Sequence, residues 1–194
     1  MNVIQDEVQL VNAACQGSIE AFEALVVRYE PRIRRMIYGL TQDVYLTQDL
    51  CQETFLAAYR ALPHVREENL HFAPWLYRIA LNQVRSEWRR RKHVTLVPFS
   101  TSSDEDDETW SEAREDLLVS EERFEEQIAY RDLVGRVLAQ LPTASAACLL
   151  LDAEGFTYHE IAEMLRETLP AIRSRLARAR QAFQRIYSGL EQEE

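Results

Sequence analysis

Cysteine, glycine and proline are scarce in this sequence, with 3, 5 and 6 residues among 194. The cysteines are odd in number and far apart, which excludes a disulfide framework and the usual zinc-ligand spacings and favours a reducing cytoplasm. No apolar run approaches the ~18 residues of a membrane span. Three acidic residues among the first twenty disfavour a signal peptide. We therefore expect a cytoplasmic protein with no membrane insertion.

The sequence also lacks an excess of positive charge: its formal net charge is −10 at pH 7. At first sight this total disfavours nucleic acid as a partner. The acids are concentrated, however: residues 101–126 hold twelve acids and two bases, and the remainder carries 20 bases and 20 acids. Two stretches of that remainder, 85–92 and 166–185, are rich in arginine. The acidic total therefore does not exclude DNA.

Signatures of catalysis and of bound cofactors are absent as well. The sequence has no Gly-rich phosphate loop and no nucleophile elbow, and its four histidines do not pair at metal-ligand spacing on one helix. His64 and His71 flank a loop with Glu67 and Glu68, which would offer metal ligands, but solvated loop residues explain that pattern better. We expect no enzyme activity, no cofactor and no metal.

Helical periodicity fills most of the chain, and no strand-turn-strand signal occurs. We predict an all-α fold of two small helical domains, residues 1–97 and 120–194, joined by a flexible acidic linker over 98–119. Ser18 is expected to cap a helix that Pro31 interrupts and bends. A further helix over 47–62 is expected to turn four residues inward: Leu50, Phe55, Leu56 and Tyr59.

The helix predicted over 72–92 has an unusual polar face. At ~100° per residue its apolar residues share one side, and the opposite side carries Trp75, Arg78, Asn82, Arg85 and Arg89. An aromatic ring can stack on an unpaired base while guanidinium groups hold the backbone and an Asn bonds a base edge. Alternatively, the ring packs on a neighbouring helix and the arginines only solvate the surface. The pattern alone leaves both open.

Residues 156–187 carry the signals of a helix-turn-helix. Thr157 and Glu160 form a capping box before a short helix that ends near Leu165. Thr168 then caps a longer helix. Arg166 stands in the turn, where many such motifs have glycine, so this turn must close without one.

The second helix of this motif has the features of a major-groove reader, with polar outward positions and arginines on its flanks. An αα-hairpin used only for packing is the alternative. The candidate DNA contacts are Thr168, Pro170, Arg173, Ser174, Arg175 and Arg178.

Two ordered sets of residues carry a family resemblance. The first set is Asp49-Leu-Cys-Gln-Glu-Thr-Phe-Leu56, Phe72-Ala-Pro-Trp-Leu-Tyr-Arg-Ile-Ala80 and Asn82. The second set is Leu141-Pro142, Leu149-Leu-Leu151, Glu154-Gly155, Tyr158, Glu160-Ile-Ala-Glu163 and Ser174-Arg-Leu-Ala-Arg-Ala-Arg180. They resemble regions 2 and 4 of the sigma-70 family, specifically its extracytoplasmic-function group. The resemblance implies a dissociable promoter-specificity subunit of RNA polymerase, without catalysis of its own.

The resemblance also implies a role for each predicted surface. The 47–62 helix would bind the clamp of core RNA polymerase through Asp49, Gln52, Glu53 and Leu56. The 64–71 loop and the 72–92 helix would melt and read the minus-ten element of promoter DNA. The 168–181 helix would read the minus-thirty-five element. An anti-sigma factor is a partner implied by the family alone.

The chain departs from the family pattern at three places. The run 143–148 replaces a segment that is usually charged, Arg166 replaces the turn glycine, and Pro170 replaces a small residue near the start of the reading helix. Two other functions therefore stay open: a sigma-like regulatory protein that does not itself initiate, and a two-domain helix-turn-helix regulator. We also expect the two domains to pack together in the isolated protein, with their basic helix faces hidden.

Overall fold

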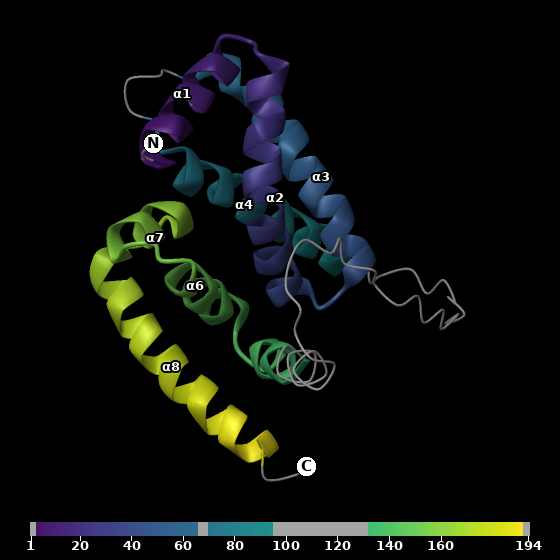
Figure 1. The fold of residues 1–194 in the computed structure, drawn as a ribbon. Coiled ribbons are helices and arrows are strands. Elements are labelled where there is room, and N and C mark those ends of the chain that lie inside the picture. The colour runs from purple at the N-terminus through teal and green to yellow at the C-terminus, as the bar shows by residue number, and fades with distance from the viewer. Residues whose placement is uncertain (1–2, 66–69, 95–131, 192–194) are drawn as a thin grey trace, which may run out of the picture.

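The computed structural model describes residues 3–65, 70–94 and 132–191 (Figure 1). Every regular element in these ranges is a helix, so the all-α prediction is confirmed. The predicted linker, 98–119, lies outside the described residues, as do both domain boundaries and part of the 64–71 loop. Within the same ranges, every helix is too short or too polar to span a membrane.

The helices before residue 95 form what we call the N-terminal group. It comprises α1 (Val3–Cys15), α2 (Ile19–Thr41), α3 (Val44–Ala61), the short 3-10 helix η1 (Leu62–His64) and α4 (Phe72–Val94). Caps set two of the helix starts: the Ser18 hydroxyl accepts from the Ala21 amide at 3.1 Å, and Asp43 Oδ1 accepts from the Leu46 amide at 2.9 Å. Helix α2 is central, because it contacts α1, α3 and α4.

Two expectations for this group were wrong. Helix α2 is continuous through Pro31, so the expected interruption is wrong. Pro31 lies on the exposed side, where water can bond to the Val27 carbonyl that lacks its helical donor. On α3, Leu50 and Phe55 are buried as predicted, but Leu56 and Tyr59 are 53% and 45% exposed.

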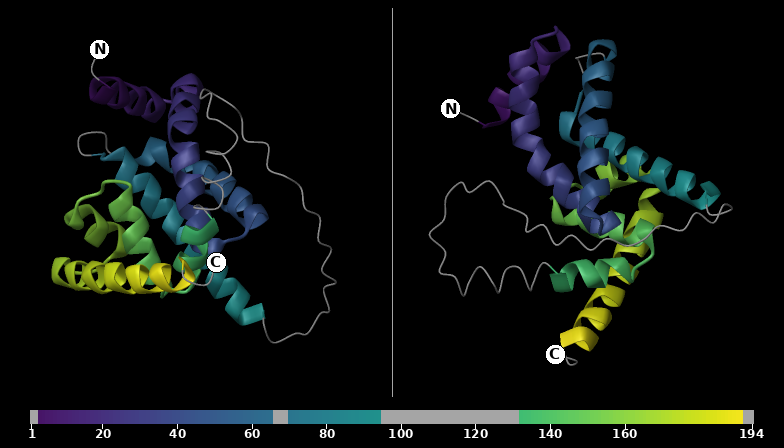
Figure 2. Two further views of the ribbon diagram at one scale, coloured as in Figure 1. Left: turned by 60° about the horizontal axis from the view of Figure 1, so that its bottom comes forward. Right: turned by 90° about the vertical axis from the view of Figure 1, so that its right-hand side faces the viewer.

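The remaining helices form the C-terminal group. Residues 132–139 are helical, and α6 (Thr143–Ala153), α7 (Tyr158–Leu165) and α8 (Leu169–Glu191) follow. Gly155 adopts a φ of 89° between α6 and α7, a left-handed conformation that costs glycine little. Helix α8 lies on the outer side, with α6 and α7 between it and the N-terminal group (Figures 1 and 2).

The two groups pack against each other and share one hydrophobic core. Helix α2 contacts α6, and α4 contacts α7. One continuous buried cluster includes Leu76 of the N-terminal group and Cys148 and Leu151 of the C-terminal group. At Gly39 on α2, an added Cβ would lie 3.0 Å from Leu150 Cδ1, so the missing side chain permits this close approach. The predicted packing of the two halves is therefore present in this structure.

A partly buried carboxylate joins the two groups. Glu154, at the end of α6, is 15% exposed, and its Oε2 accepts from Arg32 Nε at 2.7 Å and from the Tyr77 hydroxyl at 2.9 Å. Arg32 Nη2 also donates to the Glu154 carbonyl at 3.2 Å, and Arg35 Nη2 lies 3.5 Å from Oε1. Burial, together with the Glu154 charge, raises the pKa of Tyr77 far above its ordinary value. The hydroxyl therefore stays protonated and donates.

Two buried thiols provide a test of this core. Burial raises the pKa of Cys51 to about 11 and also raises that of Cys148, although Arg175 opposes part of the second shift. Since the thiolate is the reactive form, we predict that iodoacetamide modifies neither residue in the native protein near neutral pH. Both should react after denaturation, as peptide mass spectrometry would show. Rapid native labelling of either thiol would contradict the packing.

Candidate nucleic-acid interface

Helix α4 presents three differently surrounded faces. Leu76 and Ala80 are buried in the shared core. Leu81, Val84 and Trp88 line an open groove of about 230 Å³ against the start of α6. Figure 2 shows α4 running along the border of the two groups and past it. The third face is exposed to solvent, and it carries the candidate DNA contacts.

The five residues of the predicted base-reading face differ in their exposure to solvent. Arg78, Asn82 and Arg89 are exposed, and their spacing places them on one side of α4. Trp75 is half-buried, and its ring centroid lies 5.8 Å from that of Phe72. Arg85 is half-buried beside the groove. This ring contact lies within α4 itself, whereas the alternative stated for Trp75 was packing on a neighbouring helix.

A carboxylate near the end of α4 limits the basic charge of that helix, because it pairs with arginines that the sequence analysis treated as unpaired. Glu87 is only 9% exposed, and its Oε1 accepts from Arg91 Nε at 3.0 Å and from Arg90 Nη2 at 3.3 Å. Arg91 Nη2 also lies 3.7 Å from Asp43 Oδ2, at the start of α3. These pairs hold two arginines of the basic stretch to the protein, so the exposed cationic face is narrower than its composition indicates.

The predicted helix-turn-helix is formed by α7 and α8. Its capping box is present: Thr157 Oγ1 accepts from the Glu160 amide at 3.3 Å, and Glu160 Oε2 accepts from the Thr157 amide at 2.8 Å. Arg166 closes the turn in the left-handed conformation, with φ 57° and ψ 47°. The Glu167 amide then donates to the Ala162 carbonyl at 2.9 Å, which satisfies the end of α7.

Helix α8 buries one side and exposes most of the predicted DNA contacts. Ile172, Leu176 and Ala179 are buried against the rest of the group. Five of the six candidate contacts are exposed: Thr168, Pro170, Arg173, Ser174 and Arg178. The expectation that closure would hide this basic helix face is therefore wrong, because α8 packs through its opposite side.

The sixth candidate, Arg175, is placed differently. It is half-buried and forms an ion pair with Glu167 in the turn, and its charge opposes part of the burial effect that raises the pKa of Cys148. Arg180 also has an acidic partner within the protein: its Nη2 donates to Asp152 Oδ2 at 2.7 Å. These two arginines attach α8 to α6 and to the turn. Helical spacing did not reveal this, because their acidic partners come from other segments.

The residues predicted to bind polymerase lie together on α3. Asp49, Gln52, Glu53 and Leu56 are all exposed. Tyr59 lies one turn after Leu56, and its ring centroid is 5.1 Å from that of Phe22. On α2, Ile19 and Val27 are also exposed, by 54% and 77%. An exposed apolar surface bordered by polar residues is typical of a protein-binding site.

Comparisons with known proteins agree on one family. The family model described as sigma-70 region 2 matches residues 25–94, and the one described as sigma-70, region 4 matches residues 131–183. The RNA polymerase sigma-H factor of Pseudomonas aeruginosa is 32% identical over 187 residues, which cover 96% of this chain and 95% of that protein. This chain belongs to the extracytoplasmic-function group of the sigma-70 family.

Other relatives of this sigma factor also match most of the chain. The extracytoplasmic-function sigma-E factor of Escherichia coli K12 is 32% identical over 183 residues, covering 90% of both chains. Among solved structures, CnrH in complex with the cytosolic domain of CnrY aligns with a TM-score of 0.69 at 23% identity, covering 95% of this chain and 98% of that one.

A second solved structure, the sigma factor RpoE with the anti-sigma factor NepR from Bartonella quintana, gives a TM-score of 0.64 at 19% identity. It covers 88% of this chain and 98% of that one. Both structures are similar in fold to this sigma factor.

Among the described residues, no group of three or more His, Cys, Asp or Glu could hold a metal ion. Glu67 and Glu68 lie outside those residues.

The left-handed Arg166 gives a prediction for the stability of this sigma factor. A side chain in this conformation costs about 1 kcal/mol that glycine avoids, so Arg166→Gly should raise the free energy of unfolding by about that amount. Arg173→Gly, the same change inside α8, should lower it by about 1 kcal/mol. Urea unfolding measures both, and a destabilised Arg166→Gly would contradict the turn geometry.

Proposed function

We propose that this sigma factor starts transcription by reading two promoter elements with α4 and α8, while α3 binds the clamp of core RNA polymerase. The observation that carries the proposal is the pair of exposed basic faces on α4 and α8 of one chain. Each lies within a segment that matches a different sigma-70 region. The protein performs no chemistry itself and acts in the cytoplasm.

The upstream contact is assigned to α8. Arg173 and Arg178 are exposed at positions where guanidinium groups neutralise phosphates, and Thr168 and Ser174 present hydroxyl groups at the start of the helix. Pro170 lies in the same first turn, where its missing N–H costs no hydrogen bond. Arg175 is left out of this set, because Glu167 holds it.

The downstream contact is assigned to α4. Asn82 offers hydrogen bonds to the edge of an unstacked base, and Arg78 and Arg89 attract the strand backbone. Trp75 is only half-buried, and we assign the exposed part of its ring to contact with an unstacked base. Because single-stranded bases bind such a surface and paired bases do not, binding favours the opened duplex.

The exposed α3 surface is assigned to core polymerase. Leu56 provides an apolar contact, and Asp49, Gln52 and Glu53 surround it with polar groups, as in the core and rim of a protein interface. We further propose an anti-sigma factor as a regulatory partner. This is supported by RpoE, a protein of this fold that was solved in complex with the anti-sigma factor NepR.

Run-off transcription tests the function. The full-length chain is added to Escherichia coli core polymerase on a library of random-sequence templates, and enriched transcripts identify a promoter, called here the selected promoter. We expect transcripts with defined start sites that depend on the added chain. Binding to core polymerase without any transcript would instead identify a sigma-like regulatory protein. Tight binding to duplex DNA without polymerase would identify a repressor.

Replacing Asn82 should impair melting but not assembly. We predict that Asn82→Ala lowers the yield of open complexes on the selected promoter about tenfold, the effect of losing one base contact. Its affinity for core polymerase should stay that of the wild type. Permanganate footprinting measures opening, and Gln184→Ala, an exposed amide change on α8, is the control. An unchanged footprint would remove Asn82 from the reading face.

Replacing Arg178 should weaken upstream binding in a salt-dependent way. A guanidinium at a phosphate releases about one counterion, so Arg178→Ala should reduce the salt slope of holoenzyme binding to the selected promoter by about 1. Arg185→Ala removes another exposed arginine, from the later part of α8, and should leave the slope unchanged. Equal slopes for wild type and Arg178→Ala would place this arginine away from DNA.

A further inference from the structure

Glu7 on α1 accepts hydrogen bonds from two consecutive residues of α2. Its Oε2 accepts from the Tyr29 hydroxyl at 2.7 Å, and Arg28 Nη1 lies 3.5 Å from the same oxygen. Burial, together with the hydrogen bond to Glu7, raises the pKa of Tyr29 far above its ordinary value, so the hydroxyl stays protonated and donates. This bond fixes the outer end of the Tyr29 side chain.

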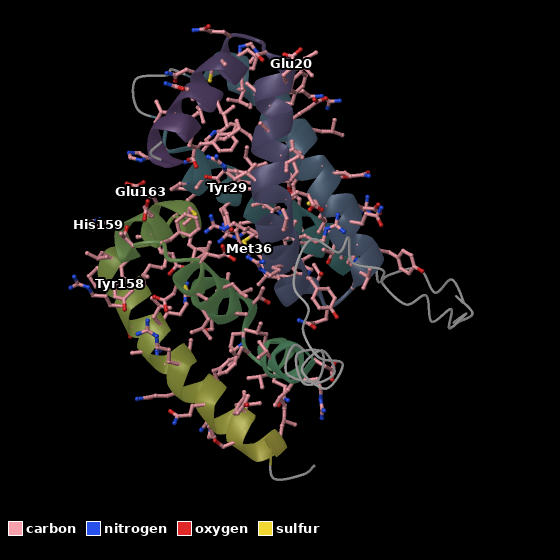
Figure 3. The ribbon with its side chains drawn as sticks, viewed as in Figure 1. Glu20, Tyr29, Met36, Tyr158, His159 and Glu163 are labelled. Carbon is pink, nitrogen blue, oxygen red and sulfur yellow. The ribbon has the colours of Figure 1, made fainter. Side chains whose placement is uncertain are left out.

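The Tyr29 ring begins a series of three contacting aromatic rings. It lies near the middle of α2, on the side that faces α1 (Figure 3), and its centroid is 5.3 Å from that of Phe72 at an interplanar angle of 60°. The Phe72 centroid in turn lies 5.8 Å from that of Trp75, at 41°. Both separations are within the range of favourable aromatic contacts. The Glu7 carboxylate is therefore connected to the Trp75 ring through two aromatic side chains.

The first two rings of this series are held on several sides. Tyr29 and Phe72 are buried in the core, and Arg32 Cζ lies over the Tyr29 ring, 5.9 Å from its centroid. In a close-packed interior, a ring that changes its tilt displaces the ring beside it. Trp75 differs, because it is only half-buried. The orientation of its ring therefore depends on the Phe72 ring, one turn earlier in α4.

Anchoring of α1 is the alternative role for the hydrogen bond to Glu7. Helix α1 has other anchors, however, because Val11 and Ala14 are buried in the shared core. A bond that served only to hold α1 would leave Trp75 on α4 unaffected. The two roles thus differ in what they predict for the tryptophan, and the continuous ring contacts favour positioning.

We propose that Glu7 and Tyr29 are positioning residues for promoter opening. Through Phe72 they hold the Trp75 ring ready to stack on an unstacked base of the minus-ten element. A side chain that is fixed before binding loses less conformational freedom when the base arrives, so the opened duplex is bound more tightly. Neither positioning residue needs to contact DNA. The inference rests on the proposed function, because only the assignment of Trp75 to a base gives the orientation of its ring a role.

Fluorine NMR of the isolated full-length chain, labelled with 5-fluorotryptophan, tests the positioning itself. Trp75→Phe identifies the Trp75 resonance by its loss. Tyr29→Phe removes only the hydroxyl group and Glu7→Ala removes its acceptor, so both should shift this resonance, with unchanged helix content by circular dichroism. Glu7→Gln keeps an acceptor oxygen and should restore the wild-type position. Gln9→Ala, an exposed change on α1, is the matched control. A wild-type Trp75 resonance in both Tyr29→Phe and Glu7→Ala would overturn the proposal.

Open-complex formation tests the consequence. With core polymerase on the selected promoter, permanganate footprinting should show about fivefold fewer open complexes for Tyr29→Phe and for Glu7→Ala, the effect of one side chain that is no longer fixed in advance. The affinity of both variants for core polymerase should stay that of the wild type, and Glu7→Gln should keep most of the wild-type yield. Wild-type yields from both Tyr29→Phe and Glu7→Ala would overturn the role in opening.

A double-mutant cycle separates positioning from a general loss of structure. In a Trp75→Ala background, Tyr29→Phe should cause no further loss of open complexes, because it acts through that ring. A further fivefold loss in this background would overturn the positioning role. A wild-type chain that forms no open complexes would contradict the proposed function instead, and the fluorine spectra would still decide whether Glu7 and Tyr29 set the orientation of Trp75.

Discussion

The partly buried carboxylate of Glu154 is the interaction on which the arrangement of the two halves depends. A carboxylate removed from water is costly unless charged or polar donors replace the lost solvent, so its position restricts where those donors can be. Arg32 and Tyr77 come from two helices, α2 and α4, and both bind the same oxygen. The end of α6 is thereby fixed against both helices, and the apolar contacts around it complete one continuous core.

Helix α4 combines three tasks that share a single segment of sequence. One face completes the N-terminal bundle, a second packs against the C-terminal group, and a third presents Arg78, Asn82 and Arg89 to solvent. Because the second face is available only when the groups separate, the state of the interface and the exposure of α4 are linked. Helix α8 differs, since its reading face is exposed while its other side packs within its own group. Separation of the two groups therefore changes the exposure of α4 but leaves the exposure of the α8 reading face unchanged.

Local signals in the sequence predicted the helices and their caps, including Ser18 and the capping box at Thr157. These features depend on residues three or four apart. The errors came from side-chain partners and exposures that the helical pattern alone does not determine. Arg175 was assigned to DNA because its partner Glu167 stands in the turn, and the apolar character of Leu56 hid its position on the outer face of α3. The pairing of Glu154 with Arg32 spans 122 residues and has no local signal.

The central claim is that the two groups are packed together in the isolated protein and separate when the sigma factor engages a promoter. Electron–electron distance measurements test it most directly, with spin labels at the exposed positions Val8 on α1 and Gln184 on α8 in a Cys15→Ser background. The account predicts one defined distance in the isolated chain and a clearly longer one in the complex with core polymerase and the selected promoter. The same distance distribution in both states would contradict it.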